Sequence, residues 1–169
     1  MTVYPSKVWN KAQLKQHLNV IDHHLHEAAF NRNAPYTNLT QSLFIELLSL
    51  EGDLLQQSEQ AGKRIDFLDE VGSNGKIQDI TSLIYSMRQS VYNFNANRHT
   101  HENITVIVPD MNHFYGAGNG YFPNGLFFVC NHEDELAFFV GQDRIYFYRH
   151  LVRAFNEART YLLATLKEQ

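Results

Sequence analysis

The spacing of apolar residues changes after about residue 95, and this change restricts the chain to a mixed fold. Before that point, apolar side chains recur at the three- and four-residue intervals of amphipathic helices. After it come short runs rich in β-branched and aromatic residues, which are typical of strands. We therefore predict an α+β fold, in which helices precede a small sheet or β-hairpin.

Three stripes predict three helices. The first helix has Ser6 as its N-cap and ends at Asn33-Ala34-Pro35, because proline cannot continue a helix. The second begins after Thr37 or Asn38, and residues 61–76, rich in glycine and charge, form a linker before the third. The three stripes are Leu14, Leu18, Ile21 and Leu25; Leu43, Leu47, Leu50 and Leu54; and Ile77, Ile80, Ile84, Met87, Val91 and Phe94.

The remaining residues are predicted to form two strands and a long C-terminal helix. The strands are expected at about 104–109 and 126–130, and the helix runs from Glu133 to about Lys167. The chain of 169 residues is then one domain, with a helical pair over 1–60, the linker over 61–76, and a core over 77–169.

Composition excludes several classes of protein. The net charge of −4 provides no basic surface for nucleic acid, and no window approaches 18 consecutive apolar residues, so we expect no membrane partner. Cys130 is the single cysteine, which rules out an internal disulfide and favours a reducing compartment. The first 15 residues lack the apolar run of a signal peptide. We therefore expect a cytoplasmic protein.

Residues 104–150 contain a series of short motifs in a fixed order. The series is Ile104–Val108, Asn112-His113-Phe114, Gly118-Asn119-Gly120-Tyr121-Phe122, Asn124-Gly125-Leu126 and Glu133-Asp134-Glu135-Leu136-Ala137. In order and spacing it resembles the core of the zinc metallopeptidase family that includes the CAAX prenyl protease and its bacterial relatives. The resemblance covers roughly a quarter of the chain and implies a zincin-like core.

The resemblance fails where that family has its His-Glu-x-x-His zinc motif. This chain has Gln142-Asp143-Arg144-Ile145-Tyr146, so a neutral amide and a phenol replace both histidines. Asp143 keeps a carboxylate, one methylene shorter than the family's glutamate. The family's third ligand would have to be Glu157 or Glu168, because only 23 residues follow Tyr146. The resemblance thus implies a truncated pseudo-metallopeptidase that holds no zinc and no other cofactor.

Two alternatives use other polar residues. Asp143, Tyr146 and His150 would share one face of the predicted helix, either as the acid–base group of a small metal-independent enzyme or as an internal hydrogen-bond cluster. His23 and His26 are spaced to bind a metal, although they fall off the apolar stripe of their helix.

The glycine-aromatic segment, Tyr115 to Phe122, is the predicted binding surface. Its glycines do not form a nucleotide-binding loop, since Tyr121-Phe122-Pro123 cannot begin the required helix, so we expect them to allow turns or bulges. The resemblance places this segment on an edge strand that pairs with extended peptides. We therefore predict a non-catalytic binding or regulatory protein that takes a peptide, a partner protein or a second copy of itself. The binding residues are Tyr115, Gly118, Gly120, Tyr121 and Phe122.

Overall fold

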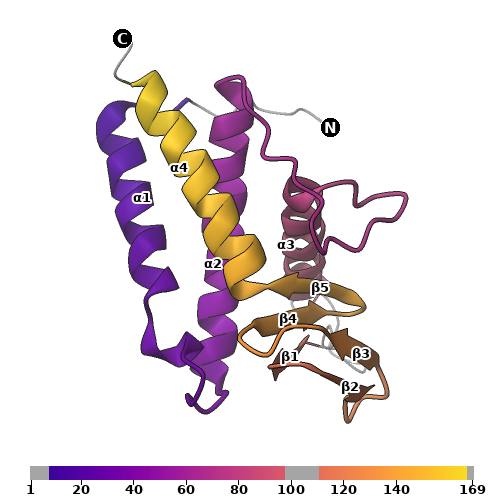
Figure 1. The fold of residues 1–169 in the computed structure, drawn as a ribbon. Helices are drawn as coiled ribbons and strands as arrows, with labels where there is room; N and C mark the ends of the chain where they lie inside the picture. The colour runs from indigo at the N-terminus through magenta and orange to yellow at the C-terminus, as the bar shows by residue number, and fades with distance from the viewer. Residues whose placement is uncertain (1–7, 98–110, 167–169) are drawn as a thin grey trace.

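The computed structural model describes residues 8–97 and 111–166, which form helices and two small antiparallel sheets (Figure 1). This confirms the predicted α+β class. The helices are α1 (Lys11–Leu25), α2 (Asn38–Gln60), α3 (Ile80–Asn97) and α4 (Arg153–Thr165), with a 3₁₀ turn at Ala28–Phe30 and a π turn at Phe147–Val152.

The two sheets are stacked on each other. The central sheet has the order β1-β4-β5, with β1 at Met111–Tyr115, β4 at Leu136–Val140 and β5 at Asp143–Tyr146. Strands β2 (Gly118–Tyr121) and β3 (Phe127–Cys130) form a separate antiparallel hairpin. The helices lie on one side of the central sheet, and the hairpin lies on the other (Figure 1).

Strand β4 is buried on both faces and so joins two apolar cores. Phe138 faces the helices, where its ring stacks on Phe44 with centroids 4.1 Å apart. Its neighbour Phe139 faces the hairpin, where it contacts the rings of Phe122 and Phe128. Successive residues of a strand point to opposite faces, so a strand between two layers is apolar throughout.

The helical half follows the predicted stripes, but the first helix differs from the prediction at both ends. All four stripe residues of α1 are buried, but Asn10 rather than Ser6 caps this helix; Ser6 lies outside the described residues. The helix ends at Leu25, well before Pro35, and the chain then turns so that Phe30 packs against Phe138 and Phe147. The start of α2 is as predicted, because Thr37 is its N-cap.

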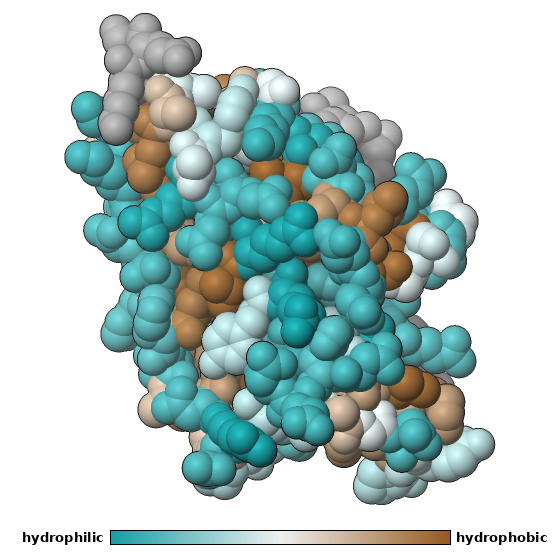
Figure 2. All heavy atoms as spheres, in the orientation of Figure 1, coloured by the Kyte–Doolittle hydropathy of each residue, from teal (hydrophilic) through white to brown (hydrophobic). Residues whose placement is uncertain are grey.

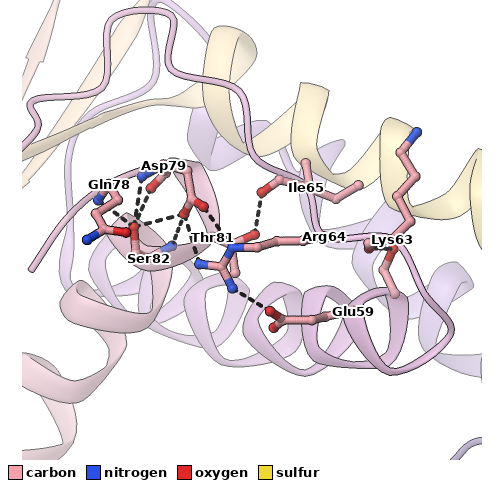
Figure 3. Close-up of polar contacts among 9 residues, drawn as sticks. Glu59, Lys63, Arg64, Ile65, Gln78, Asp79, Thr81 and Ser82 are labelled. Atoms are coloured by element: carbon pink, nitrogen blue, oxygen red, sulfur yellow. Dashed lines mark hydrogen bonds and ion pairs between the residues drawn. The ribbon is translucent and has the colours of Figure 1, made fainter.

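The segment between α2 and α3 has neither helix nor strand, yet it is held firmly (Figure 3). Arg64 donates two hydrogen bonds to Asp79, at 2.7 and 3.0 Å, and a third to Glu59 at the end of α2. Asp79 also accepts from the backbone N–H of Ser82, in the first turn of α3. This network, together with buried Ile65 and Phe67, anchors the segment to both helices.

The long helix predicted from Glu133 is wrong in its first half. Residues 136–146 form the β4–β5 hairpin, and helical structure begins at Phe147. Gly141 adopts a φ of +58° at the hairpin turn, a conformation that interrupts any helix through this point. Of the two predicted strands, 126–130 is confirmed as β3, whereas 104–109 lies outside the described residues.

Candidate functional site

The structure separates the residues that sequence reasoning had grouped around a degenerate zinc motif. Gln142 lies in the turn between β4 and β5 and Asp143 is the first residue of β5, while Tyr146 and His150 are fully buried. Because Asp143 and Tyr146 lie on a strand, the prediction that they share one helix face with His150 is wrong. The four residues therefore do not line one cleft.

His150 is committed to structural hydrogen bonds. Its Nδ1 accepts from the backbone N–H of Tyr146 at 3.0 Å, so its Nε2 carries the proton and donates to the Asp69 carbonyl at 2.8 Å. Burial lowers the pKa of His150 to about 4, which keeps the ring neutral. The Tyr146 hydroxyl accepts from the backbone N–H of Asn131 at 3.3 Å. These contacts place Tyr146 and His150, but not Asp143, in an internal hydrogen-bond network that is closed to a substrate.

The inner face of the β2–β3 hairpin explains the glycines within β2. Gly118 pairs with Cys130 and Gly120 pairs with Phe128, and this face packs onto the central sheet. A Cβ atom at Gly118 would lie 2.9 Å from the ring of Phe114. Gly118 therefore makes room for the ring of Phe114, whereas a Cβ atom at Gly120 would make an ordinary contact with the ring of Phe128 at 3.5 Å. The predicted turn conformations belong to Gly116 and Gly125, whose φ angles are positive.

The outer face of this hairpin carries three exposed apolar residues beside the polar Asn119. Tyr121 is 74% exposed, Phe127 is 56% exposed and Val129 is 39% exposed. Tyr121 pairs with Phe127 across the strands, with ring centroids 5.2 Å apart. Hydrophobic atoms gather at the lower right of Figure 2, over β2 and β3 of Figure 1. We call Tyr121, Phe127 and Val129 the outer patch.

The three aromatics predicted for the binding surface therefore differ in their environments. Only Tyr121 among them belongs to the outer patch. Phe122 is half-buried and stacks on Phe128 with centroids 4.4 Å apart, so it contributes to the inner core. Tyr115 is also half-buried, beneath the guanidinium of Arg32.

A groove of about 210 Å³ opens beside the outer patch. Its apolar walls include Phe127, Val129 and Phe139, and its polar rim includes Gln142 and Asp143. Burial raises the pKa of the Asp143 carboxyl, which has no hydrogen bond or ion pair to any residue within 8–97 and 111–166. The structure thus brings the predicted aromatic surface and two residues of the degenerate motif to one place.

Arg144 also lines the groove, but its positive charge is paired with Glu70. Its guanidinium donates to the Val129 carbonyl, contacts a Glu70 carboxylate oxygen at 3.4 Å and lies over the ring of Tyr146. Glu70 itself has a φ of +58°, a conformation that is uncommon for residues other than glycine. With Arg144 paired to Glu70, Asp143 is the charged group of the groove that has no partner among the described residues.

Sequence reasoning missed Phe127 and Val129. The run Leu126 to Cys130 is apolar throughout, so nothing in its pattern shows which alternate residues face solvent. In the structure, the strand alternates between exposed and buried positions.

The residues proposed to bind metal are not gathered into a site. His23 and His26 are exposed on α1, beside Glu27 and Asp22 respectively. Glu157 is bound by Arg153 at 2.9 Å, and Glu168 lies outside the described residues. Among the residues that the structure describes, no group of three or more His, Cys, Asp or Glu side chains is arranged to hold a metal ion.

No helix within the described ranges has the length and apolar character needed to cross a bilayer. The comparisons with known proteins found no match to a family model, a curated protein or a solved structure.

Proposed function

We propose that this chain is a non-catalytic binding protein that captures a protein or peptide through the outer patch of its β2–β3 hairpin. The observation that carries the proposal is the exposure of three large apolar side chains on one face of a two-stranded hairpin. Aromatic and aliphatic anchors of this kind commonly supply most of the free energy of a protein interface.

The size of the groove favours a polypeptide over a small molecule. Ligand pockets for drug-sized molecules usually enclose about 300–1,000 Å³. The groove beside the outer patch holds about 210 Å³, which is space for one large side chain. A protein partner can place one anchor there and cover Tyr121 and Phe127 with its neighbouring residues.

Strand β2 offers a second means of contact. It pairs with β3 alone among the described strands, and no described strand occupies its other edge. The corresponding edge of β3 is partly occupied, because Arg144 donates to the Val129 carbonyl. An extended segment of a partner can therefore add to β2 by strand pairing, with backbone hydrogen bonds beside the outer patch.

The competing enzymatic function has less support. Tyr146 and His150 are both 0% exposed, and both nitrogens of the His150 ring are used by backbone groups. A general acid or base must reach the proton that it transfers. The resemblance to the metallopeptidase family and the cytoplasmic location stay predictions from sequence, and the proposed binding depends on neither.

The test is a selection of random peptides on the immobilised protein. The double variant Tyr121→Ser with Phe127→Ser should capture at least about tenfold fewer peptides than the unmodified chain, because it removes both aromatic anchors. Leu39→Ser is the matched control, since Leu39 is 61% exposed on α2, outside the outer patch. Equal capture by all three proteins would contradict the proposal.

Sedimentation velocity of the same proteins tests a second copy as the partner. If the chain binds itself through the outer patch, the double variant should lose the association and the Leu39→Ser variant should keep it. Thermal unfolding checks folding, and the double variant should differ from the unmodified chain by about 0.5 kcal/mol or less. A large loss of stability would show that the outer patch is part of the core.

A further inference from the structure

We infer that the partner of this protein inserts a lysine or arginine side chain into the groove, with the cation against Asp143. The inference rests on the proposed function, because it names the chemistry of the partner at the same site. Its support comes from the walls of the groove, from the charge at its rim, and from the poor fit of the other side chains.

The walls of the groove suit the stem of a basic side chain. Phe127, Val129 and Phe139 present apolar surface along a space of about 210 Å³. Lysine and arginine carry three or four methylene groups behind the charged head, and they bury this stem against apolar surface while the head stays at a polar rim. The groove has the same two parts.

The charge at the rim suits a cation. The Asp143 carboxyl has no partner among the described residues, while Arg144 is already balanced by Glu70 and the Val129 carbonyl. Gln142 is exposed next to Asp143 and offers an amide oxygen as a further acceptor. The net charge of −4 also favours the approach of a basic segment.

The other kinds of anchor fit less well. An acidic side chain would bring a like charge to Asp143 in a partly desolvated groove. A purely apolar side chain would cover the Asp143 carboxylate without replacing the water that hydrates it, which is costly for a charged group. A basic side chain satisfies both the apolar walls and the carboxylate.

The experiment is a selection of random octapeptides displayed on phage, carried out on the full chain and its variants. Peptides enriched on the unmodified chain should contain Lys or Arg within two positions of a large apolar residue. The same peptides should bind Asp143→Asn about tenfold more weakly or worse, because a hydrogen bond to a charged group is lost. A separate selection on Asp143→Lys should enrich Asp or Glu instead.

Asp134→Asn is the matched control, because Asp134 is 85% exposed and is not among the residues of the groove. This variant should bind the selected peptides as the unmodified chain does. Peptides that need Tyr121 and Phe127 but carry no basic residue would overturn the inference and leave the proposed function intact. Peptides indifferent to both sites, or no enriched peptide at all, would overturn both.

Discussion

The two sides of the central sheet are covered to different extents. On the helix side, Phe138, Val140 and Ile145 are 0–5% exposed beneath the helices. On the other side, Phe139 is covered by a two-stranded hairpin that carries the exposed outer patch on its own outer face. A layer that ends in exposed aromatic residues does not stabilise the fold through them, so this side is where binding is expected.

The largest expected effects are losses of folding stability at two neighbouring residues of β4. Phe138→Ala should lower the free energy of unfolding by about 4 kcal/mol, because the helices around the cavity cannot collapse into it. Phe139→Ala should cost about 3 kcal/mol, because the small hairpin can settle onto the sheet. Urea unfolding of both variants gives the two values.

Hydrogen exchange shows which region each of these two variants destabilises. Phe139→Ala should speed the exchange of backbone amides in β2 and β3 while leaving those of α2 protected, because the hairpin opens locally. Leu39→Ser again serves as the surface control and should change neither region. Equal loss of protection in the helices and the hairpin would mean that the two sides unfold as one unit.

The next prediction concerns His150, whose ring contacts Phe67 of the helix-side core and Tyr146 of the hairpin-side core. Burial lowers the pKa of this histidine from 6.5 to about 4, so the unfolded chain binds its proton first. The contribution of His150 to stability is therefore present above pH 6.5 and is lost as the pH falls to about 4, by roughly 3 kcal/mol.

The variant His150→Phe isolates this contribution. It cannot bind the proton, so the stability advantage of the unmodified chain over it should shrink by roughly 3 kcal/mol between pH 6.5 and pH 4. Urea unfolding at several pH values measures the difference. If His150→Phe does not fold, the ring of His150 followed by NMR should stay neutral until about pH 4. Protonation near pH 6.5 would contradict the prediction.

The sequence allowed the helix side to be predicted better than the hairpin side, and the reason is physical. A helix with one buried face repeats its apolar residues, so the stripe of α1 could be read directly from Leu14 to Leu25. Strand β4 is buried on both faces, so its run Leu136 to Val140 shows no period, and the sequence alone predicts a helix there. Gly141 was the available sign that the chain turns there.

The groove could not be predicted for a related reason. The degenerate zinc motif points to Gln142 and Asp143, and the composition of the glycine-aromatic segment points to Tyr121. It is the turn at Gly141 and the stacking of the hairpin on the central sheet that bring these residues to one groove. Whether Phe127 faces solvent or core depends on what covers the hairpin, which is a property of the tertiary structure.

The smallest predicted effect concerns a second carboxyl without a partner, Glu51 on the helix side. Glu51 is 0% exposed, and neither of its carboxyl oxygens has a hydrogen-bond partner among the residues of 8–97 and 111–166. Burial raises its pKa well above the ordinary value of 4.5, because the charged carboxylate would be desolvated there. Asp143, by contrast, lines an open groove where a partner's cation can reach it.

Replacing Glu51 by an apolar residue should therefore stabilise the protein. We expect Glu51→Met to raise the free energy of unfolding at pH 7 by about 2 kcal/mol, because a similar volume is filled without a buried acid. In the unmodified chain the folded pKa lies above the unfolded pKa, so stability is lost as the pH rises above 4.5 and the advantage of Glu51→Met should grow. Glu133→Met, at an exposed position, is the control and should change stability by about 0.5 kcal/mol or less. A lower stability of Glu51→Met would show that Glu51 makes a contact that the helix side needs. The contrast between buried Glu51 and Asp143 in the groove would then be wrong.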